Sequence, residues 1–292
     1  MKFRTEIALD KCPFSLDTGS RVLLLGSCFA EGVGERLTDA LPEGQVRVNP
    51  FGVLYNPESI GQALHVLMAE PKNRAYYVGR SLFVAQDGRW HSWLFGTKLT
   101  GASRSECQER CMAALSGIDL HEVDLLVVTL GTDHYYELLD DSDHAWRAVT
   151  NCHKEPASKF AERISDGIML RQVLEEWRLF YPNLRMLLTV SPYRYAKYGM
   201  HGSQLAKARL LLLADQICQF HPKACYFPAY ELLLDELRDY RFYAADMLHP
   251  SDQAVDYIYE RFAEWCFTPQ LHAYAAERQR ELRQQRHRPI QP

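Results

Sequence analysis

Arg21-Val-Leu-Leu-Leu-Gly-Ser-Cys-Phe-Ala-Glu-Gly-Val-Gly-Glu-Arg-Leu37 is the stretch on which the fold of this 292-residue chain depends. The uncharged apolar run that follows Arg21 is typical of a strand buried on both faces, and the residues after Cys28 repeat apolar positions at helical spacing. Gly26-Ser27-Cys28 is the turn between them. A small nucleophile placed there would adjoin the free N–H groups of a helix N-terminus, which stabilise negative charge. Ser27 is therefore the leading candidate nucleophile.

Four later segments continue the same alternation. Strands are predicted at residues 45–48, 123–130, 185–190 and 224–227, with helices at about 58–68, 103–115, 160–180 and 204–220 between or after them. Strands that alternate with helices indicate an α/β fold with a parallel, doubly wound sheet, in which ligands bind beyond the carboxyl ends of the strands.

Two segments depart from the alternation and predict inserted β-hairpins. Residues 76–95 carry two aromatic and β-branched runs, 76–84 and 90–95, separated by the turn dipeptide Asp87-Gly88. Residues 135–150 carry a polar run, 140–143, between aromatic segments. We expect residues 1–276 to form a single domain with both hairpins, and residues 277–292, rich in Arg and Gln, to be a frayed or disordered tail.

Composition limits the function classes. A formal net charge of -4, with 47% hydrophobic and 24% charged residues, is ordinary for a globular enzyme and does not indicate a nucleic-acid partner. No segment has the length and hydrophobicity of a membrane span, and the first residues lack the apolar region of a signal peptide, so we expect a cytoplasmic protein without a membrane partner. The cysteines form no CxxC pair, so no metal site is expected.

Asp246 and His249 are the candidate partners of Ser27. A serine hydroxyl is a poor nucleophile until a base takes its proton, and that base needs a third group that holds its tautomer. At a spacing of three in a tight loop, the Asp246 carboxylate can reach one ring nitrogen of His249 and leave the other facing the substrate. Ser251 is predicted to cap the helix that follows.

Gly26-Ser27-Cys28-Phe29-Ala30 spells the signature of the GSCFA family, which resembles a branch of the SGNH (GDSL-type) hydrolases. The resemblance covers about residues 20–265 and includes the segments Asn49-Pro50-Phe51-Gly52, Leu130-Gly131-Thr132, Thr189-Val190-Ser191-Pro192 and Asp246-Met247-Leu248-His249-Pro250. It implies a three-layer α/β/α flavodoxin-like sheet and a serine esterase or acyl hydrolase in which Ser27 attacks, His249 is the base and Asp246 orients it. It implies no cofactor.

The oxyanion hole is the point at which the chain departs from that pattern. In SGNH hydrolases a glycine after the second strand and an asparagine after the third complete it. Gly52 matches the glycine by position, but the third strand is followed by Gly131-Thr132-Asp133-His134, without an asparagine. The candidate substitutes are Thr132, Asn151, His153 and Asn49. Asn151 is favoured, because the hairpin can return its far end to the strand terminus.

Several alternatives stay open. His91 is a candidate for the mouth of the site, and Arg194 for a clamp on a substrate carboxylate or phosphate, although an exposed loop arginine is the simpler interpretation. Cys28 is an alternative nucleophile, because a helix N-terminus lowers the pKa of a thiol. The aromatic hairpins suit a sugar as well as an apolar acyl chain, so an acetylated sugar is one candidate ester. An O-acyltransferase with the same three residues and a non-catalytic binding module are the alternative functions.

Overall fold

A five-stranded parallel sheet forms the centre of the molecule in the computed structural model, which describes residues 4–139 and 148–286. Its strands are β1 (Val22–Gly26), β2 (Val46–Val48), β5 (Leu125–Leu130), β9 (Arg185–Val190) and β10 (Ala224–Tyr226). They lie in the order β2-β1-β5-β9-β10, and every neighbouring pair is parallel. This is the flavodoxin-like order. The predicted fold class and all five strands are confirmed.

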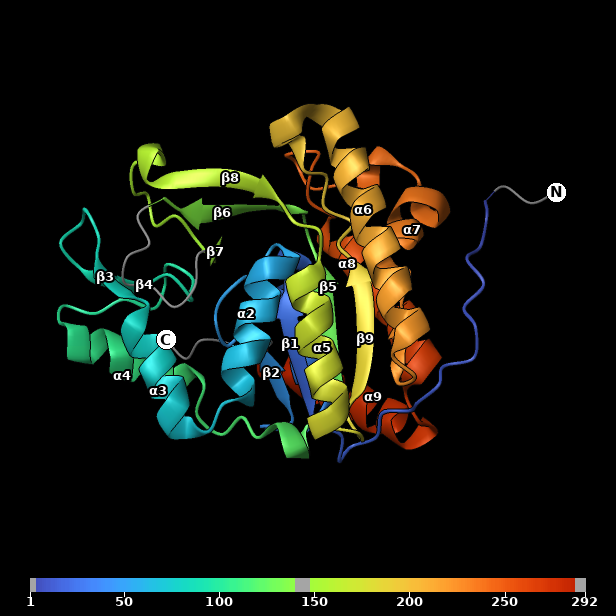
Figure 1. Cartoon of the computed structure of the whole chain (residues 1–292). Coiled ribbons are helices and arrows are strands. Elements are labelled where there is room, and N and C mark those ends of the chain that lie inside the picture. The colour runs from blue at the N-terminus through green and yellow to red at the C-terminus, as the bar shows by residue number, and fades with distance from the viewer. Residues whose placement is uncertain (1–3, 140–147, 287–292) are drawn as a thin grey trace, which may run out of the picture.

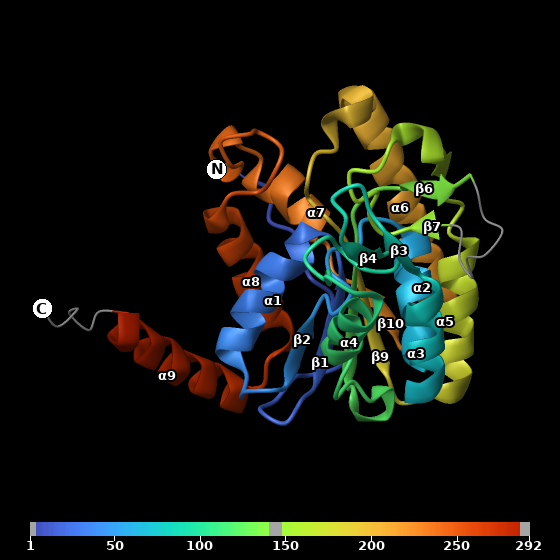
Figure 2. The ribbon, with the colours of Figure 1, turned by 90° about the vertical axis from the view of Figure 1, so that its left-hand side faces the viewer.

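Helices cover both faces of this sheet (Figures 1 and 2). On one face lie α2 (Pro57–Met68), α5 (Ile168–Phe180) and α6 (Gly199–Phe220), and on the other lie α1 (Cys28–Ala40) and α8 (Asp252–Cys266). The alternation of side chains along β1 explains the two layers, because Leu23 belongs to the core of the first face and Leu24 to that of the second. The arrangement is the predicted three-layer α/β/α fold.

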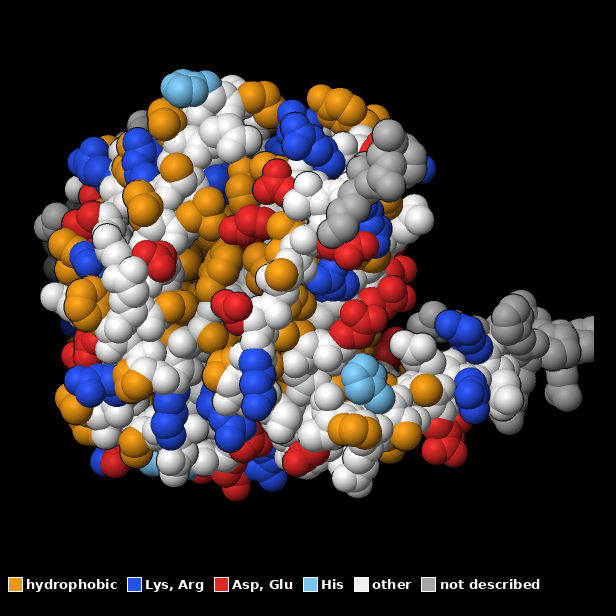
Figure 3. All heavy atoms as spheres, turned by 90° about the vertical axis from the view of Figure 1, so that its right-hand side faces the viewer, with side chains coloured by type: hydrophobic (Ala, Val, Ile, Leu, Met, Phe, Trp, Pro, Cys, Tyr) orange, Lys and Arg blue, Asp and Glu red, His pale blue; other side chains and the backbone are white. Residues whose placement is uncertain are grey.

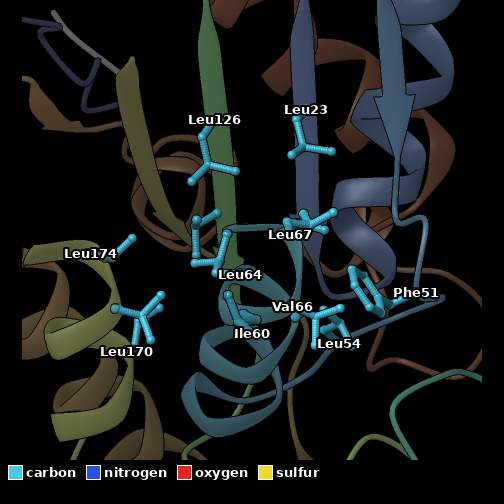
Figure 4. Packing of buried hydrophobic residues seen from close by; sticks show 14 of the residues in the cluster. Leu23, Phe51, Leu54, Ile60, Leu64, Val66, Leu67, Leu126, Leu170 and Leu174 are labelled. Carbon is cyan, nitrogen blue, oxygen red and sulfur yellow. The ribbon is translucent and has the colours of Figure 1, made fainter. Parts of the chain in front are cut away.

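The core beneath α2 also holds the loop that leads into that helix (Figure 4). Leu23 of β1 and Leu126 of β5 face α2, and Phe51 and Leu54 from the loop are fully buried in the same cluster. Burying side chains of this size contributes roughly 1.5–3 kcal/mol each. The loop is therefore anchored by its own apolar residues next to the carboxyl ends of the strands.

Two small antiparallel sheets accompany the central one. The first pairs β3 (Leu82–Val84) with β4 (Trp90–Ser92), and the second has the order β7-β6-β8, formed by β6 (His134–Leu138), β7 (Ala148–Val149) and β8 (Phe160–Ile164). β6 begins four residues after β5 ends, and Figure 1 shows β6 and β8 at that end of the central sheet. Both predicted hairpins are present in part, and the polar run 140–143 lies outside the described residues.

Two of the predicted elements are wrong. Residues 76–78, predicted as a strand, belong to α3 (Pro71–Arg80), which starts with a proline in its first turn, buries Val78 and packs against α4 (Arg104–Ala114). Packing here overrides the β-propensity of the two tyrosines. Residues 160–164, predicted as the start of a long helix, pair with β6 as a strand, and the helix begins only after Gly167, whose φ is 71°.

The C-terminal part of the chain is helical as far as the structure describes it. After β10 come the short α7 (Ala229–Glu231), a π-helical turn (Leu232–Leu237) and α8, and the chain ends in α9 (Pro269–Arg286). Helix α9 projects from the body, and its basic side chains are arginines (Figures 2 and 3). The predicted tail thus begins as a helix, and residues 287–292 lie outside the described residues. None of the described helices is long and apolar enough to cross a membrane.

Candidate active site

The turn at Ser27 depends on the glycine before it. Gly26 has a φ of 147°, and a Cβ at this position would lie 2.3 Å from the backbone oxygen of Thr129 in β5. Only glycine adopts this conformation without strain and permits such a close approach. As a result the Ser27 N–H donates to the Thr129 carbonyl at 3.2 Å, and Ser27 is held between the ends of β1 and β5.

The Ser27 hydroxyl is not used as a helix cap. Ser27 occupies the N-cap position of α1, but its side chain accepts no hydrogen bond from the first turn, whereas the N-cap side chains Asn56, Ser103 and Ser251 all do so. Its Oγ is buried and has no partner within residues 4–139 and 148–286. Since a buried hydroxyl without a partner costs roughly 1–3 kcal/mol, this oxygen has no structural function that would account for its position.

Ser27 lies in the wall of a cavity of about 610 Å³ at the carboxyl ends of β1, β5 and β9. Of the residues predicted from the sequence, the lining contains Ser27, Thr132, Asn151 and His249. This is the end of a doubly wound sheet at which ligands are expected. Cys28, the alternative nucleophile, also lines the cavity, and its Sγ lies 3.5 Å from the Tyr55 hydroxyl.

Asp246 and His249 make the contact expected from their spacing. Nδ1 of His249 donates to Oδ2 of Asp246 at 2.5 Å, while Oδ1 of Asp246 accepts the backbone N–H groups of Leu248 and His249, each at 2.9 Å. The hydrogen bond from His249 and these N–H groups lower the pKa of Asp246 to about 2. With Nδ1 as the donor, Nε2 of His249 is the nitrogen that can accept a proton.

No hydrogen bond joins Ser27 to His249 in this structure, since the Ser27 Oγ is without a partner in the described part of the chain. Both residues nevertheless line the same cavity, and the imidazole packs against the ring of Tyr193, with centroids 4.4 Å apart. Hydrogen bonds between catalytic groups are often long in unliganded enzymes and tighten when the substrate binds. Proton transfer between the two residues requires such a closure.

Arg194 ties down the loop that carries His249. Its backbone N–H donates to the Leu248 carbonyl at 3.0 Å, and its Nη1 donates to the Met247 carbonyl at 3.1 Å. The guanidinium also lies over the ring of Tyr243, 5.4 Å from its centroid. Arg194 does not line the cavity, so the structure gives it contacts with the protein itself in place of the predicted clamp on a substrate anion.

Three of the predicted oxyanion residues, Gly52, Thr132 and Asn49, make hydrogen bonds within the protein. Gly52 lies outside the cavity lining, and its N–H donates to the Asn49 carbonyl at 2.7 Å. The N–H of Thr132 donates to the Tyr55 carbonyl at 2.8 Å, and the Thr132 hydroxyl accepts from His134 at 3.3 Å. Asn49 accepts the Gly26 N–H at 2.9 Å through its Oδ1, and its buried Nδ2 has no partner in the described residues, but Asn49 lies outside the cavity lining. The backbone N–H groups of Gly52 and Thr132 are therefore not free to replace the missing asparagine.

His91 and His153 lie together outside the cavity lining, in a buried cluster with Phe83 and Trp93. Their ring centroids are 4.8 Å apart, and Nε2 of His153 lies 3.0 Å from the Ser92 carbonyl oxygen. Burial and the neighbouring His91 lower the pKa of His153 to about 4. No group of three or more His, Cys, Asp or Glu side chains among the described residues is arranged to hold a metal ion. His153 supports the cavity wall, since its backbone N–H donates to Oδ1 of the cavity residue Asn151 at 2.7 Å.

The sequence did not identify two residues that shape the site, Lys207 and Asn56. Lys207 is fully buried, and its Nζ donates to the carbonyls of Gly131 at 2.6 Å and Ser191 at 2.8 Å. Burial lowers its pKa to about 7. The spacing of Lys207 does indicate that it is buried, because it lies on the same helical stripe as the buried Ser203 and Leu210.

The chain matches one protein family and resembles solved structures at low sequence identity. Residues 21–262 match the model of the GSCFA family. Among solved structures, the fold is similar to that of a protein provisionally described as a platelet activating factor from Streptococcus pneumonia, with 13% identity over 83% of each chain and a TM-score of 0.39. It is also similar to an acetyl xylan esterase, Est2A, from the rumen bacterium Butyrivibrio proteoclasticus, with 10% identity over 86% of this chain and 64% of that one, at a TM-score of 0.35. A comparison with curated proteins gave no match.

Proposed function

The chain belongs to the GSCFA family, and on that premise we propose that it is a serine esterase or acyl hydrolase with Ser27 as its nucleophile. One observation carries the proposal. The Ser27 hydroxyl, at a helix N-cap where serine ordinarily caps, is left without a partner in the described residues and borders the cavity that His249 also lines. The Asp246 carboxylate on Nδ1 of His249 supports the same assignment.

The reaction follows from these contacts. Nε2 of His249 takes the proton of the Ser27 hydroxyl as Oγ bonds to the ester carbonyl carbon, and the carbonyl oxygen becomes an oxyanion. The intermediate collapses, the alcohol leaves with the proton from Nε2, and an acyl-Ser27 remains. Water then repeats the sequence and releases the carboxylic acid. Asp246 keeps the proton on Nδ1 and stabilises the imidazolium formed in both steps.

The cavity suits an ester of moderate size. Its volume of about 610 Å³ lies in the usual range of small-molecule sites, roughly 300–1,000 Å³. Tyr55, Tyr136, Tyr193 and Tyr195 line it, and tyrosines offer both a flat apolar face and a hydroxyl, which suits a sugar ring. We therefore propose an O-acylated sugar as the substrate class. A cytoplasmic location and the absence of nucleic-acid and membrane partners stay predictions.

A fluorophosphonate probe, combined with hydrolysis of p-nitrophenyl acetate, tests the proposal. The wild-type protein should be labelled and hydrolyse the ester, and Ser27→Ala should do neither. Ser103→Ala is the matched control, because Ser103 also precedes a helix but caps it through its side chain, away from the cavity. It should be labelled like the wild type. Cys28→Ala should also be labelled, which separates Ser27 from its neighbour.

Two results would contradict the proposal. The first is a wild-type protein that is neither labelled nor active, and the second is equal labelling of Ser27→Ala. Addition of a sugar acceptor to the same assay distinguishes hydrolysis from acyl transfer, because a transferase would form the new ester in preference to free acetate.

A further inference from the structure

The segment that contains Asn56 is bonded to the strand ends on both sides of Ser27. The Leu54 N–H donates to the Gly26 carbonyl at 2.8 Å, and the Tyr55 carbonyl accepts the N–H groups of Gly131 at 2.9 Å and Thr132 at 2.8 Å. The buried side chains of Phe51 and Leu54 fix the loop from below (Figure 4). This segment is thus a rigid part of the cavity wall.

Gly131 brings this segment next to the nucleophile. A Cβ at position 131 would lie 2.9 Å from the Tyr55 backbone oxygen and 3.2 Å from Cβ of Ser27. The Tyr55 carbonyl and the Ser27 side chain therefore both lie close to Cα of Gly131. Asn56 follows Tyr55 directly, is only 6% exposed and lines the cavity together with Ser27.

The amide of Asn56 is oriented by its own helix. Oδ1 accepts the Ser59 N–H at 2.8 Å, as the N-cap contact of α2. This contact turns Oδ1 toward the first turn of α2, so Nδ2 points away from that turn. Within residues 4–139 and 148–286 no acceptor is found for Nδ2, although the residue is buried against the cavity. Two N–H donors in the wall of the cavity that Ser27 also lines are thus without a partner in the described part of the chain.

The competing donors are less suitable. The N–H groups of Ser27 and Gly131 already have acceptors, the carbonyls of Thr129 and Tyr55. Asn151 resembles Asn56, because its Oδ1 also accepts a backbone N–H, that of His153. The residue before it, Thr150, bonds to the carbonyls of Trp93 and Leu94, just after β4, and not to the ends of β1 or β5 that hold Ser27.

We propose that the side-chain amide of Asn56 is the oxyanion donor of this site, in the role that the sequence resemblance led us to expect after the third strand. As Ser27 Oγ bonds to the carbonyl carbon, the C=O π electrons move to the oxygen, and Nδ2–H donates to that charge. The inference rests on the proposed esterase function. A fixed donor that meets the charge only as it develops accelerates the reaction without tightening substrate binding.

Asn56→Asp tests the proposal, because the carboxylate keeps the cap acceptor and removes the donor. For p-nitrophenyl acetate we expect kcat to fall about 100- to 1,000-fold with KM nearly unchanged, as for the loss of a donor in other oxyanion holes. Fluorophosphonate labelling should slow in parallel, while the melting temperature stays close to that of the wild type. Asn56→Ser, which also caps, should show the same loss of kcat.

Asn151→Asp is the matched comparison, since it retains its acceptor for the His153 N–H and loses its amide donors in the same way. Its kcat should fall far less than that of Asn56→Asp. The proposal is overturned if both Asn56 variants keep wild-type kcat while Ser27→Ala is inactive, or if the loss appears in Asn151→Asp alone; the esterase function stands in both cases. Full activity of Ser27→Ala would contradict the proposed esterase function itself.

Discussion

Nδ1 of His249 lies 2.5 Å from Oδ2 of Asp246, across a turn in which the other carboxylate oxygen accepts two backbone N–H groups. The carboxylate of Asp246 thus orients the imidazole and also stabilises the turn. Because its pKa is lowered to about 2, from about 3.9 in an unfolded chain, the contact is fully present above pH 4 and is lost as the pH falls through 2. The pair is intact over the neutral range.

Asp246→Asn should lower kcat by about 100- to 10,000-fold, with little change in KM. The amide can still accept the two backbone N–H groups, but it no longer stabilises the imidazolium and permits the wrong tautomer of His249. Steady-state hydrolysis of p-nitrophenyl acetate measures this. Asp239→Asn is the control, because Asp239 makes a similar turn contact with the Arg241 N–H and does not line the cavity. Equal activity of Asp246→Asn and the control would contradict the assigned role.

Arg194→Met should lower kcat about tenfold and affect neutral and anionic esters alike. The variant loses the guanidinium contact with the Met247 carbonyl that holds the loop of His249, and misplacement of a catalytic group slows the chemical step. Comparison of KM for a neutral ester and for an anionic analogue measures the effect. Arg241→Met, which loses an exposed ion pair with Asp239 and a contact with the Phe242 ring but no contact with the Met247 carbonyl, should behave as the wild type. A rise in KM confined to the anionic ester would instead identify Arg194 as a substrate clamp.

Lys207→Met should change how stability depends on pH. The folded pKa of Lys207 is about 7 and the unfolded one about 10.4, so between these values the unfolded chain holds a proton that the folded chain has lost. The free energy of unfolding of the wild type therefore gains up to about 1.4 kcal/mol per pH unit in this window, and the variant lacks this gain.

Urea unfolding at pH 7, 8 and 9 measures the difference between the wild type and Lys207→Met. It should grow with pH in favour of the wild type. The exposed Lys98→Met serves as the control and should show no such trend. A constant difference for Lys207→Met would show that the buried amine does not titrate in this range.

Much of the fold followed from local patterns. The strands β1, β5 and β9 were predictable because each is a run of apolar residues, and a strand buried on both faces leaves that signature wherever it lies in the sheet. The edge strands β2 and β10 are short and half-buried and carry a weaker signal. The errors at residues 76–78 and 160–164 have one cause. Both are short segments whose state depends on a partner, α4 in one case and β6 in the other, that lies elsewhere in the chain.

The residues of the candidate site were likewise predictable only where the sequence signal was local. Ser27 and the pair Asp246 and His249 were recognisable because a turn between strand and helix and a spacing of three residues are local features. Gly52 was matched by position, but its N–H turns to Asn49 and away from the cavity. The wall beside Ser27 is formed instead by Asn56, which became a candidate only when the hydrogen bonds of its segment were known.

The sequence by itself determined the order of strands and helices, the position of Ser27 after the first strand and the contact between Asp246 and His249. These depend on periodicity and on chain spacing of a few residues. Only the tertiary structure decided which side chains share the cavity, that Lys207 is buried against two backbone carbonyls of its wall, and that Asn56 lines it together with a serine 29 positions earlier in the chain. The reason is physical: these relationships arise from packing and hydrogen bonds between strand ends that the sheet, and not the chain, brings together.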